Sequence, residues 1–249
     1  MKVSIITVVF NNVLTLKDAI DSVLSQTHKN IEYIVIDGGS VDGTLELILS
    51  YEDKLAIILS EPDKGIYDAM NKGLKLASGD IIGILNSDDI YQDNRVIEDV
   101  VSEFIQDSQL DILYGDLVYV KQSNTAEVVR IWKSLTYYDK YFEDGNVPPH
   151  PTVFLRSNVY KTVGYFNLKL RLAADYEFLL RVFKLNEFKS KYINRLLVRM
   201  RLGGATNKNF RNIIVGNKEI LYSWKSNGLN SPYFLFAKRL FIRCFQFFH

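Results

Sequence analysis

Short apolar runs alternate with amphipathic stretches along the N-terminal part of the chain. The runs are rich in β-branched residues and bounded by glycine or polar clusters, which predicts buried strands over VSIITVVF, IEYIVID, LAIILS and DIIGIL. Apolar residues at helical spacing predict helices over 12–26, 43–51 and 65–77, the first with Asn12 as its N-cap. Because strands alternate with helices, we expect right-handed βαβ units and a parallel sheet.

The period changes after Asp107. The stretch LDILYGDLVYVKQSNTAEVVRIW predicts two strands joined by a polar hairpin around residues 122–124, and mixed segments follow it. The chain has no internal repeat, low-complexity tract or clear linker. We therefore expect one domain with a C-terminal extension.

Composition places the chain among ordinary soluble globular proteins, with 249 residues of which 47% are hydrophobic and 24% charged. The single cysteine, Cys244, excludes an internal disulfide and a metal site of the Cys and His type, and it fits a reducing compartment. The apolar start is similar to a signal peptide, but it lacks a small-residue cleavage site and runs into Asn11 and Asn12, which favours a first strand. Since no apolar run reaches the ~18 residues of a membrane span, we expect a cytoplasmic protein.

The formal net charge of +1 is unevenly distributed. Residues 205–249 carry seven basic residues and one acidic residue, Glu219, so this part has a net charge of +6 and residues 1–204 have −5. A basic, aromatic C-terminal part on an acidic body predicts different partners for the two parts.

Polar side chains follow each of the four predicted strands. The carboxyl ends of parallel strands lie at one edge of a sheet, where ligands of open α/β sheets bind, so these side chains should converge there. For any one loop, turn residues are the simpler explanation, but four converging loops favour a binding site. The residues are Phe10 and Asn11, then Asp37 to Ser40, Glu61 to Gly65, and Asn86 to Asp89.

Two features of these loops indicate the chemistry of a ligand. Gly38 and Gly39 allow tight turns and a close backbone approach, and Asp37 can accept a hydrogen bond from a ring N–H such as that of uracil. Asp88 and Asp89 are adjacent carboxylates, which repel each other unless a cation or a proton intervenes.

Five segments together resemble the family 2 glycosyltransferases, which have the GT-A fold: SIITVVFNN, IEYIVIDGGSVDGT, EPDKGIYDAMNKGLKLASGD, GILNSDDIY and GYFNLKLRLAADYEFLLRV. The resemblance covers residues 3 to about 185, and the ordered set is far more specific than any one segment. It implies an α/β fold with a mostly parallel, Rossmann-like sheet and helices on both faces. The nucleotide-binding half would span about 1–107 and the acceptor half about 108–204, followed by a helical extension over 205–249.

The activity that the resemblance implies is inverting transfer of a sugar from a nucleotide diphosphate sugar, with a UDP-sugar as the expected donor, to a hydroxyl group. The acceptor would be a glycan or a lipid-linked glycan, as in the synthesis of bacterial surface polysaccharide. A divalent cation, Mg²⁺ or Mn²⁺, would assist the transfer. No nucleic-acid partner is expected, and self-association is left open.

The end of the fourth strand departs from the family's DXD signature. The family usually has Asp where Asn86 stands, while Asp88 occupies the position of the second aspartate. Asp88 is therefore the first candidate metal ligand, although the neutral amide of Asn86 contributes one negative charge less. Asp89 is a candidate for a second metal contact, and capping of the following helix is the favoured alternative.

Candidate donor-binding residues come from the strand ends and from the helix predicted to begin at Gly65. A helix start next to Lys64 suits an anion, and Asp68 and Asn71 are three residues apart, so we expect them to share a face and reach the nucleotide together. A second aspartate common after strand two is replaced by Gly38. The full set is Thr7, Phe10, Asn11, Asp37, Gly39, Asp63, Lys64, Gly65, Asp68, Asn71, Asn86, Ser87 and Asp88.

The segment LAADYEFLLRV supplies the candidate catalytic base. By resemblance, Asp175 aligns with the family's general base, whereas its position alone fits a cap of the helix that follows. Glu177 would point elsewhere on that helix. His150, between two prolines, is open to several roles: contact with the diphosphate, metal binding, placement of the acceptor, or a structural turn.

The C-terminal residues 231–249 predict an amphipathic helix from Pro232. One apolar stripe contains Phe234, Ala237, Phe241, Phe245 and Phe248, and another face contains Arg239, Arg243 and Gln246. Such a helix fits an anionic membrane surface on the inner face of the cytoplasmic membrane. The alternatives are packing on the protein's own body or on a second subunit.

Rival functions fit the sequence less well. A sugar nucleotidyltransferase needs a Gly-rich basic loop after strand one, where this chain has FNNVLT, and an aspartyl-phosphate enzyme needs carboxylates there. A sugar-nucleotide-binding scaffold with weakened catalysis remains an alternative because of Asn86. Donor hydrolysis would separate an enzyme from such a scaffold.

Overall fold

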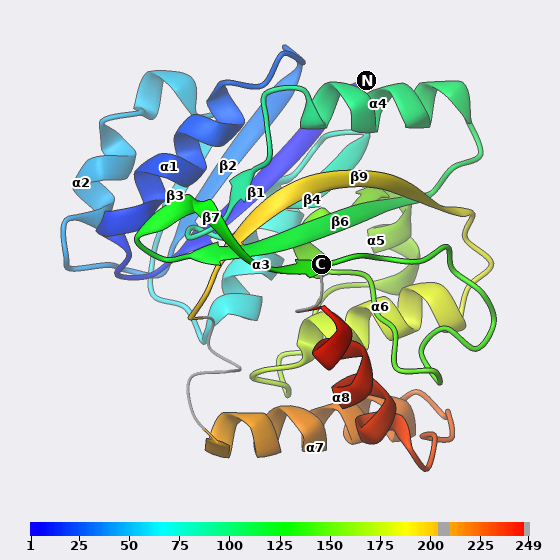
Figure 1. The fold of residues 1–249 in the computed structure, drawn as a ribbon. Helices are drawn as coiled ribbons and strands as arrows, with labels where there is room; N and C mark the ends of the chain where they lie inside the picture. Colours follow the sequence, from blue (N-terminus) through cyan, green and yellow to red (C-terminus); the bar gives the residue numbers. More distant parts are fainter. Residues whose placement is uncertain (204–209, 247–249) are drawn as a thin grey trace.

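The computed structural model describes residues 1–203 and 210–246. Within these residues the strands form one mixed sheet (Figure 1): β1 (Val3–Val9), β2 (Ile31–Asp37), β3 (Ile57–Ser60), β4 (Ile81–Ile84), β5 (Ile90–Tyr91), β6 (Ile112–Lys121), β7 (Asn124–Trp132), β8 (Phe154–Arg156) and β9 (Ser190–Arg201). Their order is β3-β2-β1-β4-β8-β6-β9-β5, and β7 pairs with β6.

The first half of the sheet is parallel, as the alternating pattern predicts. β1 lies between β2 and β4, with Val3 opposite Ile31 and Ile81, and β2 pairs in parallel with β3. The carboxyl ends of these strands therefore lie on one edge. The second half is mixed, because β8 runs antiparallel to both β4 and β6, whereas β9 is parallel to β6. The predicted hairpin is confirmed by the antiparallel pair β6 and β7.

Helices cover both faces of the sheet (Figure 1). One face packs against α1 (Val13–Leu24), α2 (Thr44–Leu49) and α4 (Val96–Gln106). The other face packs against α3 (Ile66–Leu76), α5 (Ser157–Val163) and α6 (Ala174–Lys184). Two short 3₁₀ helices, η1 (Glu52–Lys54) and η2 (His150–Thr152), complete the connections. The three helices predicted between the first strands are confirmed, with ends shifted by a few residues.

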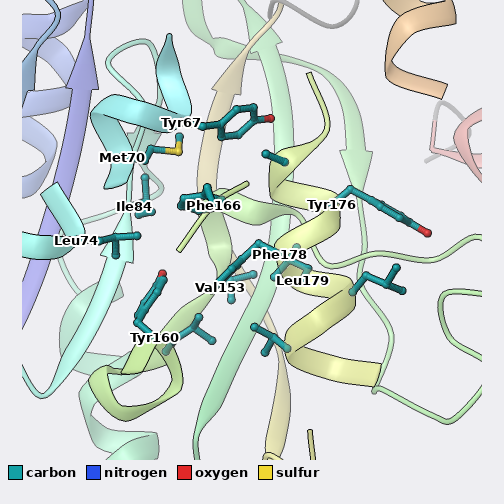
Figure 2. Packing of buried hydrophobic residues seen from close by; sticks show 14 of the residues in the cluster. Tyr67, Met70, Leu74, Ile84, Val153, Tyr160, Phe166, Tyr176, Phe178 and Leu179 are labelled. Carbon is teal, nitrogen blue, oxygen red and sulfur yellow. The ribbon is translucent and has the colours of Figure 1, made fainter. Parts of the chain in front are cut away.

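Alternation along β1 divides the core into two layers. Ile6 and Val8 face the α3 side, whereas Ile5 and Val9 face the α1 side. On the α3 side, aromatic side chains join helices that are distant in sequence: Phe166 lies 5.7 Å from Tyr67 and 4.9 Å from Phe178, measured between ring centroids (Figure 2). Full burial of one such side chain contributes about 1.5–3 kcal/mol, so this layer fixes α3 relative to α6.

The C-terminal part forms α7 (Phe210–Ser226) and α8 (Leu235–Phe245), which confirms the predicted helical extension. Ile220 and Trp224 of α7 and Leu235 of α8 are buried in the layer that contains α3 and α6. The Trp224 indole N–H donates a hydrogen bond of 2.9 Å to the Tyr176 hydroxyl. The extension is therefore packed against the face of the sheet that α3 and α6 cover. None of the helices in the described ranges has the length and apolar character that crossing a membrane requires.

The face of α8 that packs on the body is not the predicted apolar stripe. Leu235 is buried and Phe236 packs against the core, whereas Phe234 is 73% and Phe241 65% exposed. Arg239, expected on a face open to lipid, has a buried Nη1 atom and lines a cavity of the body instead. Periodicity predicted the helix but not its rotation, because the tertiary contacts that set the rotation come from distant segments. The Phe245 side chain and Phe248 lie outside the described residues.

Candidate active site

A cavity of about 690 Å³ lies beyond the carboxyl ends of β1 and β4. Its walls come from both halves of the chain: the loops after β1, β3 and β4, the first turns of α3 and α6, η2, the end of β9, and α7 and α8. Its volume is in the usual range for a small-molecule site. The predicted edge of the sheet is therefore hollow and is closed by η2, the start of α6, α7 and α8.

Seven of the predicted donor-binding residues line this cavity: Phe10, Asn11, Asp63, Gly65, Asn86, Ser87 and Asp88. Asn11 has a positive φ of 49°, which is uncommon for a residue with a side chain. Its carboxamide oxygen accepts a hydrogen bond from the Val41 N–H, and its own N–H donates to Ser40 Oγ. These bonds tie the loop after β1 to the loop after β2.

Asp37 and Thr7 do not line the cavity. Asp37 is fully buried, and its carboxylate accepts hydrogen bonds from the Ser40 and Ser60 hydroxyls and from backbone N–H groups of its own loop. Thr7 is also fully buried, with Oγ1 3.1 Å from the Tyr33 hydroxyl. Both side chains hold the sheet edge and its loops together in the described state.

The other four candidates, three around the start of α3 and one after β2, do not line the cavity. Asp68 accepts the Lys64 N–H at 3.0 Å, and Lys64 is exposed. Asn71 is buried and makes two hydrogen bonds of 2.9 Å with the backbone N–H and carbonyl of Phe166, so it does not share an open face with Asp68. Gly39 has a positive φ of 84°, which glycine adopts readily, in the turn after β2.

The end of β4 concentrates polar groups that lack partners. Asn86 Nδ2 donates to Asp89 Oδ2 at 2.9 Å, while Asn86 Oδ1 and Asp89 Oδ1 are buried with no hydrogen-bond partner in the described structure. Asp89 does not cap a helix, because α4 begins later and Arg95 occupies its N-cap position. The capping alternative is wrong.

Burial is the main influence on the pKa of Asp88 and Asp89, the adjacent aspartates after β4. It raises the pKa of Asp88, against the opposing charge of Arg201. Burial also raises the pKa of Asp89 well above its ordinary value, and the adjacent Asp88 charge acts in the same direction. Arg201 holds this loop by donating from Nη1 to the Asp88 carbonyl at 2.8 Å, and it forms an ion pair with Asp18. A cation bound here would favour the ionised form of these carboxylates.

The oxygens at the end of β4 suit a cation site that a bound substrate would complete with its own phosphate oxygens. Among the described residues, no group of three or more His, Cys, Asp or Glu side chains is arranged to hold a metal ion. Asp88 and Asn86 do line the cavity, and Asn86 Oδ1 is unpartnered. Mg²⁺ is commonly bound by one or two carboxylates together with substrate phosphates. These residues therefore suit a hard cation whose remaining ligands come from a bound diphosphate.

Asp175 faces the same cavity from the start of α6. It is the second residue of the helix, Ala173 is the N-cap, and no side chain caps this end, so the capping alternative for Asp175 is also wrong. Its Oδ1 accepts a hydrogen bond of 2.9 Å from the Tyr67 hydroxyl of α3. Burial raises the pKa of Tyr67 well above its ordinary value, and the Asp175 charge adds to this, so Tyr67 keeps its proton and donates.

His150 also lines the cavity, from η2. Its ring meets the Phe166 ring edge to face, with 5.5 Å between the centroids. Burial lowers the pKa of His150, against the charge of Asp175, so the imidazole is neutral at pH 7. The charge that acts on it belongs to Asp175 on the acceptor side.

Comparison with known proteins identifies the chain. Residues 4–162 match the family described as Glycosyl transferase family 2. The chain belongs to this family. An uncharacterized glycosyltransferase of Mycobacterium tuberculosis is 34% identical over 181 residues, which cover 72% of this chain and 68% of that protein. The PGL/p-HBAD biosynthesis glycosyltransferase of Mycobacterium bovis is 29% identical over 208 residues, 82% of this chain and 78% of the relative.

Solved structures agree with this glycosyltransferase fold. S. aureus TarS 1-349 in complex with UDP-GlcNAc matches with a TM-score of 0.69 at 20% identity, covering 96% of this chain and 69% of TarS 1-349. The mannosyltransferase PcManGT from Pyrobaculum calidifontis, in complex with GDP-Man and Mn²⁺, matches with a TM-score of 0.67 at 15% identity, covering 98% and 69%. The chain spans 41% of a longer TarS chain that it also matches. The expected GT-A fold is confirmed.

Two residues that support the glycosyltransferase site were not identified from the sequence. Tyr67 carries the hydrogen bond to Asp175, and no local pattern indicates a partner 108 residues away. Glu219 of α7 accepts hydrogen bonds from the backbone N–H groups of Arg171, Leu172 and Ala173, at 2.8–3.0 Å, directly before α6. Its one signal in the sequence is that it is the single acidic residue of a basic segment.

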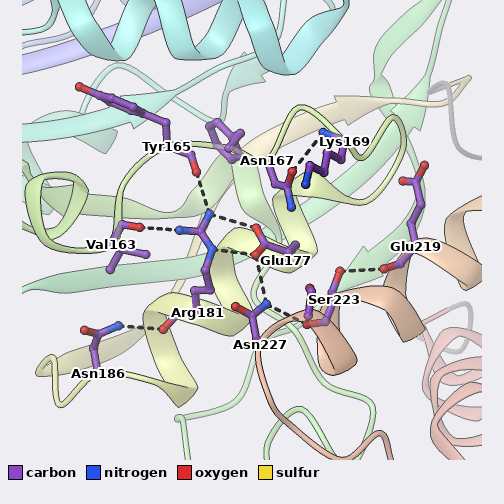
Figure 3. Close-up of polar contacts among 12 residues, drawn as sticks. Val163, Tyr165, Asn167, Lys169, Glu177, Arg181, Asn186, Glu219, Ser223 and Asn227 are labelled. Atoms are coloured by element: carbon purple, nitrogen blue, oxygen red, sulfur yellow. Dashed lines mark hydrogen bonds and ion pairs between the residues drawn. The ribbon is translucent and has the colours of Figure 1, made fainter.

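Glu177 points away from the cavity, as expected. It is buried and pairs with Arg181, with Nε to Oε1 at 2.8 Å, and it accepts a hydrogen bond of 3.1 Å from Asn227 (Figure 3). Arg181 also donates to the carbonyls of Val163 and Tyr165. This network joins α6 to the end of α7 and to residues 163–165, which precede α6. It stabilises the packing of these segments and lies outside the cavity lining.

Proposed function

We propose that this family 2 glycosyltransferase transfers a sugar from a UDP-sugar to a hydroxyl of a glycan or lipid-linked glycan, with inversion at the anomeric carbon. The observation that carries the proposal is that Asp88 and Asp175 line one cavity, from β4 and α6 respectively. A donor-side carboxylate and a candidate base on opposing elements suit a direct displacement, in which the acceptor oxygen attacks as the bond to the diphosphate breaks. The structures of TarS with UDP-GlcNAc and PcManGT with GDP-Man support a nucleotide sugar as donor.

Asp88 and Asn86 would hold Mg²⁺ or Mn²⁺ together with the donor phosphates. When bound, the cation neutralises the charge that develops on the departing diphosphate. The Mn²⁺ in the PcManGT complex supports the use of a divalent cation. Asp89, buried behind these residues, would orient Asn86 through their hydrogen bond.

Asp175 would accept the proton of the attacking hydroxyl. The Tyr67 hydrogen bond holds the carboxylate in one orientation, and the second oxygen is left for the acceptor. His150, neutral and subject to the Asp175 charge, would help to place the acceptor hydroxyl. The two halves of the chain would thus divide the work between leaving group and nucleophile.

The proposed acceptor class gives α8 a second use as a peripheral anchor on an anionic membrane. Tyr233, Phe234 and Leu240 are exposed, as is Lys238 of the same segment, which suits the headgroup boundary of a cytoplasmic membrane face. Replacing Phe234 and Leu240 by Ser should reduce sedimentation with anionic vesicles, while replacing Ile105, an exposed residue of α4, should not. Equal sedimentation of the two variants would argue against the anchor.

Donor hydrolysis tests the enzyme proposal directly. The full chain would be incubated with UDP-sugars and GDP-mannose plus Mn²⁺, and release of nucleoside diphosphate would be followed with and without chelator. Release from one donor, lost on chelation, supports a metal-assisted glycosyltransferase. Tight donor binding with no release, even with a panel of glycan acceptors, would favour the binding scaffold that Asn86 suggests.

A further inference from the structure

Helix α8 contributes two arginines to the cavity. Arg239 and Arg243 are four residues apart, which places them on one face of the helix, and both line the cavity. The helix reaches this position through a close approach at Gly145, where an added Cβ would lie 2.9 Å from the Arg239 backbone nitrogen. Lys238 secures the same turn by an ion pair of 2.8 Å with Asp144.

Arg239 lacks an acidic partner in the described structure. Its guanidinium lies over the Tyr176 ring, 5.0 Å from the centroid, and its Nη1 is buried without a hydrogen-bond partner. Burial lowers the pKa of Arg239, Tyr176 opposes this, and the charge of Arg243 acts in the same direction as burial. Arg239 is half-buried, and a guanidinium that keeps a buried N–H group without a hydrogen-bond partner is costly, so a bound anion would stabilise it.

The charges around Arg239 place it on the acceptor side of the cavity. Asp175 is the acidic side chain that acts on Arg239, whereas Arg201 is the cation that acts on Asp88. The candidate base and Arg239 therefore lie near each other. An anion bound by Arg239 would belong to the molecule that carries the attacking hydroxyl.

The pair of arginines favours a phosphate over a carboxylate. Two guanidinium groups repel each other, and Arg130 adds to the positive charge around Arg243. A phosphate ester carries about −1.5 to −2 charges at pH 7 and offers three acceptor oxygens, which matches two planar donors better than a single carboxylate does.

We propose that Arg239, assisted by Arg243, binds a phosphate group on the acceptor close to its attacking hydroxyl. This inference rests on the proposed glycosyl transfer and specifies the substrate class of the same site. The phosphate can belong to the sugar itself or join it to a lipid chain, since the oxyanion chemistry is the same.

Calorimetric titration of the full chain, saturated with UDP and Mg²⁺, tests the proposal. Glucose 1-phosphate represents a glycan phosphate and hexyl phosphate a lipid phosphate, while methyl glucoside and hexanol are the neutral counterparts. We expect at least one phosphate ester to bind and its neutral counterpart not to bind. The ester that binds more tightly identifies the source.

Arg239→Gln should weaken phosphate-ester binding by about tenfold or more, because the amide loses the charge of the guanidinium and most of its N–H donors. UDP affinity should stay within twofold. Lys238→Gln is the matched control, because it removes a charge from the same turn that pairs with Asp144 instead of lining the cavity. Arg243→Gln should also weaken the phosphate ester, and it carries the test if Arg239→Gln does not fold.

Two results would overturn the phosphate site. One is a wild type that binds neither phosphate ester with UDP in place. The other is a loss of UDP affinity in Arg239→Gln as large as the loss for the phosphate ester, which would assign the arginine to the donor. Failure of the underlying function is separate, because it appears as absent donor release in the wild type.

Discussion

At the scale of single residues, the site combines carboxylates in different electrostatic settings. Asp89 is fully buried, the adjacent Asp88 is half-buried, and the pKa of each is raised. Asp175 instead has one oxygen hydrogen-bonded to the Tyr67 hydroxyl. The first setting suits a group that is ionised by a cation, and the second suits one that is oriented to receive a proton.

Asp175→Asn should reduce sugar transfer by at least about a hundredfold, within the range usual for loss of a general base. The amide keeps the shape and can still accept from Tyr67, but it cannot take a proton. Nucleotide affinity, measured by calorimetry, should stay within a few fold. Asp139→Asn, at a side chain that is 92% exposed, is the control for loss of one charge. Near-normal turnover in Asp175→Asn would remove this residue from the mechanism.

Asp88→Ala should weaken the binding of both the cation and the donor, because one cation would bridge the carboxylate and the diphosphate. For the same reason, exhaustive chelation should abolish the activity of the wild type. Titration of Mn²⁺ in the presence of UDP measures both effects. The companion variant Asn86→Asp should tighten Mn²⁺ binding if position 86 faces the metal. Full activity after chelation would mean that protein cations stabilise the leaving group.

At the scale of elements, the start of α6 is held by α7. The three backbone N–H groups before the helix all donate to the Glu219 carboxylate. This arrangement fixes the segment that leads into α6 and lets a C-terminal helix determine where Asp175 stands.

Glu219→Gln should lower turnover about tenfold while donor affinity stays unchanged. The amide nitrogen cannot accept a hydrogen bond, so at least one N–H of residues 171–173 loses its partner, at a cost of about 1–3 kcal/mol. The measurement is kcat and KM for the donor, with the melting temperature recorded alongside. Lys218→Gln, at an exposed neighbour, should match the wild type. A parallel loss of UDP affinity would show general damage in place of a positioning role.

At the scale of the whole molecule, the edge of the sheet opposite the cavity is closed by a polar cluster. Glu32 of β2 accepts hydrogen bonds from Lys2, Ser4 and Ser78, so it joins β1 to the segment before β4. Burial alone would raise the pKa of Glu32, but these bonds outweigh it and lower the pKa to about 2.

As the pH is lowered, protonation of Glu32 should therefore reduce the free energy of unfolding. A lowered folded-state pKa contributes stability that is complete above the unfolded pKa, near 4.5, and is lost as pH falls toward about 2. The contribution is up to about 3 kcal/mol. Urea unfolding of wild type and Glu32→Gln at pH 7, 4 and 3 should give a difference that shrinks with falling pH. A constant difference would contradict the assignment.

Sequence patterns predicted what depends on short-range periodicity. The first four strands, the helices between them and the β6–β7 hairpin are confirmed, and Asn86, Asp88 and Asp175 do line one cavity. These predictions succeed because burial of one face imposes a period on neighbouring residues.

Contacts between side chains that are distant in sequence produce no periodic pattern, so the sequence does not predict them. The sequence predicted that Asn71 and Asp37 bind the nucleotide sugar. In the fold, Asn71 is hydrogen-bonded to the Phe166 backbone and Asp37 to the Ser60 hydroxyl. The rotation of α8, which turns Arg239 inward, is likewise set by contacts around Gly145. Such assignments depend on tertiary packing, which overrides local preference.

Helix α3 links the Gly65 loop at one side of the cavity to Asp175 at the other. It starts at the Gly65 loop on the donor side, and its next two turns carry Tyr67, bonded to Asp175, and Asn71, bonded to Phe166. In the proposed mechanism, a donor that steadies the Gly65 loop would also steady Asp175, and a bound acceptor that steadies Asp175 would then tighten the donor by the same factor. Water makes no such contacts, so under this mechanism hydrolysis of the donor would be slower than transfer to the acceptor.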